Sequence, residues 1–162
     1  MKPSMALSLN NQVQKEYESS YLYLSMASFF EEQGFSGLAS WMKKQSQEEL
    51  QHALKFFDFI HHNNGKVTLQ SIPSPVSEWN SIKAVFEASL SHEQMISKSI
   101  DDLINQAIAE KDHASHHFLL EFATEQLEEE NTARDIVRKL ELIGNTHPTG
   151  LLLLDKELGQ RP

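Results

Sequence analysis

Two short motifs with the same spacing place polar, metal-ligating residue types where helices should be apolar. In the segment QSQEELQH, residues 45–52, Glu49 and His52 are three residues apart. That spacing brings both side chains to one face of a helix, about one turn apart. Gln126 and Glu129 repeat the spacing in a later segment. Both pairs fall on the helix face that is otherwise apolar, so burial of their polar groups needs a chemical reason.

Two further carboxylates, Glu16 and Glu93, interrupt the apolar seams of two other predicted helices. All four seams are apolar toward both ends and polar near the middle. A single such Glu is more often a snorkelling surface residue, and a single His is more often a satisfied core residue. Four apolar seams that each carry polar residues near the middle of the helix indicate instead that these residues meet and act together. Carboxylates buried together must take up protons or bind cations, and four of them with one imidazole suit two iron or manganese ions, and tolerate zinc.

A second acidic group lies beside the first. It consists of Glu48, Glu125 and Glu128, together with Glu129. Like charges three or four residues apart destabilise a helix. One interpretation is a solvated acidic face, and the other is a third cation site next to the pair. The residues alone leave both open.

Tyr23 lies two turns beyond Glu16 on the same seam. It could be a core aromatic residue whose hydroxyl finds a partner. Alternatively, it could hydrogen-bond a metal ligand or donate an electron.

Glycine and proline divide the chain into long segments rich in helix-forming residues. The predicted helices span about 4–33, 36–64, 81–110, 113–143 and 148–159. The first two and the next two are joined by short turns, so each pair is antiparallel. Between them, a segment of about fifteen residues with two prolines can extend about 50 Å, against roughly 40 Å for a long helix. We therefore expect an all-α fold: one domain over 1–162, a four-helix bundle with one long crossover and a short C-terminal fifth helix.

Composition narrows the chemistry. The 162 residues are 40% hydrophobic and include no cysteine, which excludes thiolate metal sites and disulfides. The net charge of −9 argues against a nucleic-acid partner, because such proteins need a basic face. No apolar run approaches membrane-spanning length, and no signal peptide is recognisable. A cytoplasmic protein without membrane contact is expected.

The motifs EYESSYLY, QEELQH, HEQMI and TEQLEEE occur in an order that resembles a bacterial non-haem ferritin, a family of the ferritin-like di-iron group. The resemblance extends from KP at the start to GLLLLDKEL near the end. It implies that a first iron is bound by Glu16, Glu49 and His52, and a second by Glu49, Glu93 and Glu129, with Gln126 beside them. It also implies a third iron at Glu48, Glu125, Glu128 and Glu129, and places Tyr23 near the first iron.

The resemblance further implies a function and an assembly. Iron(II) would be oxidised by O2 or H2O2, and the product stored as ferric oxyhydroxide inside a homo-oligomeric shell of 24 copies. The short fifth helix would line the four-fold axes through a stripe of Leu151, Leu154 and Leu158, unless that stripe simply packs on the bundle. Haem-binding relatives carry methionine where this chain has Leu50, so no haem is expected.

Three other functions fit a bundle of this type. A di-iron oxygenase or peroxidase usually has two Glu-x-x-His motifs, and this chain has Gln126-x-x-Glu129 in place of the second. A shell protein that coats DNA would need a basic tail. A non-catalytic shell subunit would lack part of the ligand set. Iron storage with ferroxidase activity is therefore the preferred hypothesis.

Overall fold

The computed structural model of the chain describes residues 1–144 and 147–162. These residues form five helices: α1 (Pro3–Glu32), α2 (Ser36–His62), α3 (Ile82–Glu110), α4 (His113–Ile143) and α5 (Pro148–Leu158). Their ends lie within two residues of the predicted ones, and no strand occurs in the described ranges. The predicted all-α bundle with a fifth helix is confirmed. None of the described helices is long and apolar enough to cross a membrane.

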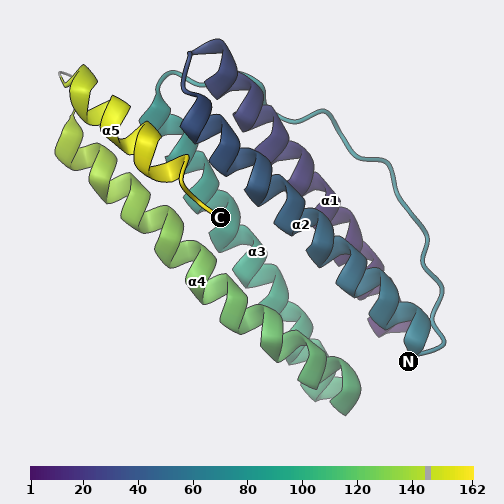
Figure 1. Cartoon of the computed structure of the whole chain (residues 1–162). Coiled ribbons are helices and arrows are strands. Elements are labelled where there is room, and N and C mark those ends of the chain that lie inside the picture. Colours follow the sequence, from purple (N-terminus) through teal and green to yellow (C-terminus); the bar gives the residue numbers. More distant parts are fainter. Residues whose placement is uncertain (145–146) are drawn as a thin grey trace.

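The long helices form two antiparallel pairs, α1 with α2 and α3 with α4 (Figure 1). The segment between α2 and α3 runs along the outside of the bundle from one end to the other, as expected (Figure 1). Hydrogen bonds tie it to α1: Asn10 Oδ1 accepts the backbone N–H of Thr68 at 2.7 Å, and Ser25 Oγ donates to the carbonyl of Val76 at 2.6 Å. The crossover therefore lets α3 begin beside the turn that joins α1 to α2.

Side chains and backbone conformation define the helix ends. Ser81 and Asp112 cap α3 and α4, because their side-chain oxygens accept the backbone N–H of Ala84 and Ser115, each at 3.0 Å. Between these helices Lys111 adopts a left-handed conformation with φ 55°. The turn is therefore short enough to make α3 and α4 direct neighbours.

Helix α5 packs against the start of α2. Asp155 Oδ1 accepts the backbone N–H of Leu38 at 2.9 Å, which caps α2 from the other end of the chain. A Cβ at position 37 would lie 1.9 Å from the Asp155 carbonyl oxygen, so this contact requires Gly37. Leu154 and Leu158 are buried in the same region.

This packing favours the second of the two roles considered for the leucine stripe, which is packing on the bundle. Leu154 and Leu158 belong to the hydrophobic core, and Leu151 packs against it. The stripe therefore covers the subunit's own bundle, and the leucines left exposed on α5 are Leu152 and Leu153.

The core is divided into two apolar clusters along the bundle. One contains Phe30 and Phe86, near the end where α5 packs, and the other contains Phe56 and Phe122. Buried polar residues lie between them in sequence on every long helix. The polar middle of each seam thus becomes a layer inside the protein.

Candidate metal centre

The polar layer contains a compact group of three metal-ligating residues. Glu16 comes from α1, and Glu49 and His52 come from adjacent turns of α2. Each offers one ligand atom, and these atoms lie within 4.8 Å of one another. All three residues are buried, with 1%, 1% and 7% of their surface exposed. This spacing allows one cation to contact all three.

One carboxylate oxygen of this group has no hydrogen-bond partner among the described residues. Gln12 Nε2 donates to Glu16 Oε1 at 2.7 Å, but Glu16 Oε2 is buried and accepts no hydrogen bond from any described residue. Buried polar atoms are normally satisfied, so an unsatisfied carboxylate oxygen calls for an explanation. A bound cation would satisfy it, and the residue types present fit iron.

Without a cation, the group favours bound protons. Burial, and then the nearby Glu49 carboxylate, raise the pKa of Glu16 well above its usual value. Burial alone would lower the pKa of His52, but its contact with Glu49 and the charges of Glu16 and Glu125 outweigh this and raise the pKa to about 9. A cation that binds here would replace these protons.

Glu93, from α3, is buried nearby and is held by two neighbours. The Tyr23 hydroxyl donates a hydrogen bond to Glu93 Oε1, and Gln126 Nε2 donates to Glu93 Oε2 at 3.0 Å. Burial, and then the charge of Glu49, raise the pKa of Glu93 to about 8. Glu93 is not part of the three-residue group. Tyr23 does more than fill the core, because its hydroxyl contacts Glu93, a predicted ligand, directly.

Glu129, from α4, is only partly buried and is linked to the group by an amide. Gln45 Nε2 donates to Glu129 Oε2 at 2.8 Å and to Glu49 Oε1 at 3.2 Å. Burial, and then Glu49, raise the pKa of Glu129 to about 6. Gln45 therefore joins the carboxylates of α2 and α4, a role that sequence reasoning did not assign.

The sequence contains a signal for this missed role. Gln12 and Gln45 each precede a buried glutamate by four residues, and each donates to that glutamate. A glutamine one turn before Glu16 and another one turn before Glu49 could have been read as a pair of supporting amides. Gln12 is itself fixed by Ser99 Oγ, which donates to Gln12 Oε1 at 2.7 Å.

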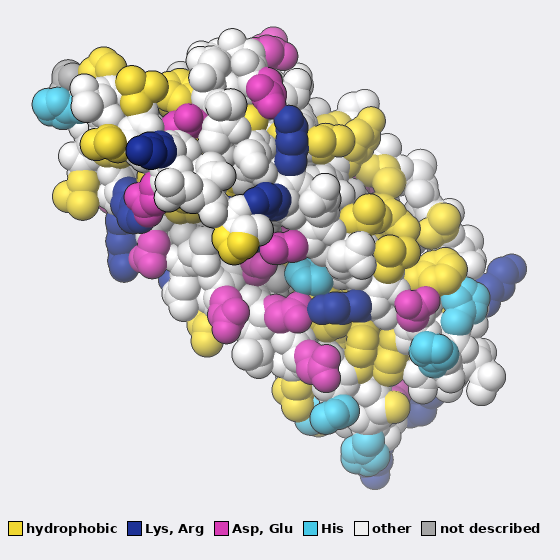
Figure 2. Space-filling view, in the orientation of Figure 1, with side chains coloured by type: hydrophobic (Ala, Val, Ile, Leu, Met, Phe, Trp, Pro, Cys, Tyr) yellow, Lys and Arg dark blue, Asp and Glu magenta, His cyan; other side chains and the backbone are white. Residues whose placement is uncertain are grey.

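The second acidic group surrounds a hollow of about 300 Å³ beside the buried residues. Figure 2 shows Asp and Glu side chains gathered over the middle of the face between α2 and α4, with basic side chains among them. The hollow is lined by Glu48, Gln51, His52, Lys55, Glu125, Glu128 and Glu129. All four predicted acids therefore lie together, but Lys55 Nζ is 3.0 Å from Glu125 Oε1, and Arg161 Nη2 is 2.6 Å from Glu48 Oε2.

Comparisons with known proteins agree with this architecture. Residues 6–143 match the family described as the ferritin-like domain. The chain is 44% identical to the bacterial non-heme ferritin of Bacteroides fragilis, over 94% of each chain, and 33% identical to that of Escherichia coli, over 98% of this chain and 95% of the relative. The crystal structure of an open pore ferritin from Archaeoglobus fulgidus superimposes with a TM-score of 0.98 at 46% identity, covering 100% of this chain and 98% of that one. The chain belongs to the ferritin family.

Proposed function

We propose that this protein oxidises Fe(II) and stores the resulting Fe(III), as a ferroxidase and iron store. The observation that carries the proposal is the buried group of Glu16, Glu49 and His52, in which one carboxylate oxygen has no partner among the described residues. This group lies in a fold shared with ferritins. Buried carboxylates stabilise Fe(III) over Fe(II), so they favour the oxidation.

Two neighbouring irons explain the need for several carboxylates. Two Fe(II) ions supply two electrons, which with two protons reduce O2 to H2O2, or H2O2 to two molecules of water. We assign Glu16, Glu49 and His52 to the first iron, and Glu49, Glu93 and Glu129 to the second. Gln126 would act beside the second iron by holding Glu93. Tyr23 would act the same way from α1, because its hydroxyl donates to the same carboxylate.

A third iron is proposed at the acidic hollow. Glu48, Glu125, Glu128 and Glu129 all line it. It adjoins the first site through His52, which also lines it. Iron leaving the pair, or waiting to enter it, would find carboxylates there.

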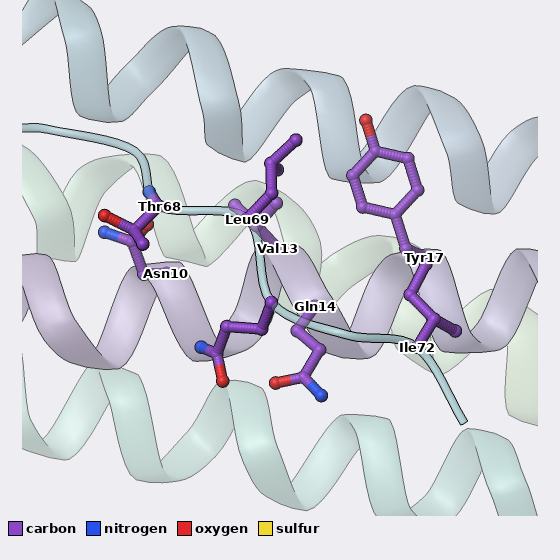
Figure 3. A pocket seen from close by; sticks show the side chains of 8 residues that line it. Asn10, Val13, Gln14, Tyr17, Thr68, Leu69 and Ile72 are labelled. Carbon is purple, nitrogen blue, oxygen red and sulfur yellow. Dashed lines mark hydrogen bonds between the residues drawn. The ribbon is translucent and has the colours of Figure 1, made fainter.

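We also propose assembly into a shell of 24 copies, each folded as a single domain over residues 1–162. Large apolar side chains remain exposed on the outer face of α1 and on the crossover: Tyr21, Leu24, Leu69, Ile72 and Val76. Figure 3 shows Leu69 and Ile72 on the crossover close to Val13 and Tyr17 of α1, where they line a pocket of about 230 Å³. Contact between subunits would cover this apolar surface. Light scattering should then give about 440 kDa, because each chain has a mass of 18.5 kDa.

Stopped-flow absorbance after anaerobic loading with Fe(II) tests the proposed activity. Mixing with O2 should give a fast di-ferric signal at about two to three irons per chain, and a ferric mineral on further additions. Glu49→Ala should abolish the fast phase, whereas the exposed Glu32→Ala should retain it. A wild-type protein with no fast phase would contradict the assignment, and oxidation of an organic substrate without mineral would favour an oxygenase.

Two expectations from the sequence remain predictions. Leu50 takes the place of the methionine that haem-binding relatives carry, so the protein should bind no haem. Absorbance after incubation with haem should therefore show no bound pigment. Fractionation of source cells would check the cytoplasmic location.

A further inference from the structure

The last residues of the chain reach the metal centre. After α5 ends, the last residues continue toward the middle of the bundle, where the C-terminal end of the chain lies (Figure 1). The Arg161 guanidinium packs 4.8 Å from the ring of Trp41, and Lys44 Nζ donates to the Arg161 carbonyl. Only 22% of the Arg161 side chain is exposed. These contacts hold the side chain in one place.

From this position the guanidinium contacts two side chains, one buried inside the bundle and one near its surface. Arg161 Nη1 donates to Gln45 Oε1 at 3.0 Å, and Nη2 donates to Glu48 Oε2 at 2.6 Å. Gln45 is buried in the polar layer, whereas Glu48 lies at the edge of the acidic hollow. One planar group therefore spans the buried group and the hollow.

The bond to Gln45 fixes the direction of its amide. Because a guanidinium only donates, it must contact the amide oxygen, and this leaves the amide nitrogen to face the carboxylates. Gln45 Nε2 then donates to Glu49 and Glu129. A rotated amide would direct its oxygen at two carboxylates, which is unfavourable.

We propose that Arg161 is a positioning residue for the metal centre: through Gln45 it orients Glu49 and Glu129, and by pairing with Glu48 it limits cation binding in the acidic hollow. This inference rests on the proposed function. The C-terminal segment thereby favours metal at the buried group over metal in the hollow. Loss of Arg161 should therefore weaken metal binding at the buried group and strengthen it in the hollow.

Zinc binding measured by calorimetry, on assembled protein, separates these effects without any redox step. The buried group is measured in a Glu128→Gln background, which weakens the hollow, and the hollow is measured in a Glu49→Gln background. Arg161→Ala should weaken binding at the buried group by roughly 10-fold, as expected for loss of an outer partner. The same change should strengthen binding in the hollow a few-fold, since it removes a cation that competes there.

Conservative variants distinguish the two contacts. Arg161→Lys keeps the charge but loses the planar guanidinium that contacts both side chains. Zinc binding in the hollow should therefore be as weak as in the unmutated protein, whereas binding at the buried group should be weakened as in Arg161→Ala. In a Gln45→Ala background, Arg161→Ala should have no further effect on the buried group, because the path through the amide is already lost. Arg138→Ala, which removes another arginine paired with one carboxylate, is the matched control and should change neither value.

The outcomes separate this proposal from the proposed function. If unmutated protein binds zinc at the buried group and Arg161→Ala leaves both affinities unchanged, the positioning role is wrong while the metal centre stands. If Arg161→Ala weakens the buried group equally with and without Gln45, the path through Gln45 is wrong. If unmutated protein binds no zinc at the buried group, the metal centre itself is wrong. Thermal melting and particle mass must match the unmutated protein for each comparison.

Discussion

His52 lies between two carboxylates on opposite sides of its ring: Nδ1 is 3.2 Å from Glu49 Oε2, and Nε2 is 3.0 Å from Glu125 Oε2. Glu49 belongs to the buried group, whereas Glu125 lines the hollow. A ligating histidine is usually oriented by a carboxylate at its other nitrogen. Glu125 Oε2 accepts no hydrogen bond from the described residues, but its charge lies beside this nitrogen and raises the pKa of His52, so an acid of the outer hollow also acts on the inner site.

Replacing Glu125 should therefore affect both locations. Glu125→Gln removes one of the charges that raise the pKa of His52, so that pKa should fall from about 9. We expect zinc affinity at the buried group to drop roughly 10-fold. Histidine resonances in a pH titration, followed by calorimetry, would measure the two effects. Glu121→Gln, on the same helix and exposed, is the control, and an unchanged His52 pKa in Glu125→Gln would contradict the contact.

Tyr23 should matter through Glu93. Tyr23→Phe removes the hydroxyl that donates to Glu93 Oε1, which leaves a buried carboxyl oxygen with fewer partners. We expect a loss of about 1–3 kcal/mol in the free energy of unfolding. Single-turnover iron oxidation should also slow, because Glu93 would be less well fixed. Urea denaturation would measure the first effect, with the half-exposed Tyr21→Phe as control; equal stability of the two variants would mean that the bond is unimportant.

The metal-free protein should lose stability as the pH rises. The pKa of Glu93 is raised to about 8 in the folded protein, and that of His52 to about 9. A folded-state pKa above the unfolded one contributes stability that is complete below the unfolded pKa and is lost as the pH rises through the folded pKa. For Glu93 this window runs from about 4.5 to 8, and for His52 from about 6.5 to 9.

Metal binding should follow the opposite trend. Because a cation replaces the protons on these groups, zinc affinity should increase between pH 5 and pH 9, with release of protons. Calorimetry in buffers of different ionisation enthalpy would count the protons. Denaturation of metal-free protein at several pH values would test the stability trend, and Glu93→Gln should flatten it. A metal-free protein that becomes more stable toward pH 8 would contradict the burial of protonated carboxyls.

The sequence predicted the buried acids because helical periodicity alone decides which residues share a face. Glu16, Glu49 and Glu93 each interrupt an apolar seam, and each is buried in the structure. Contacts made by the last segment of the chain could not be predicted this way. Asp155 and Arg161 act on residues more than a hundred positions earlier, and only the docking of α5 brings them there. The surface covered by the leucine stripe was left open for the same reason, since an apolar face does not say which surface it will cover.

Gly37 should connect the docking of α5 to the position of Arg161. In Gly37→Ala the added Cβ would lie 1.9 Å from the Asp155 carbonyl oxygen, a backbone atom, so α5 must shift. We expect a loss of about 1–3 kcal/mol in the free energy of unfolding, typical of overpacking. Because Arg161 follows α5 and packs on Trp41, the shift should also change tryptophan fluorescence and weaken zinc binding at the buried group.

Ser36→Ala, at the exposed first position of α2, is the matched control and should leave all three measurements unchanged. Arg161→Ala combined with Gly37→Ala gives the sharper comparison. If Gly37 affects the metal centre only by placing Arg161, the zinc affinity of the double variant should equal that of Arg161→Ala alone. A further loss in the double variant would mean that the start of α2 reaches Glu49 by another path, through the helix itself.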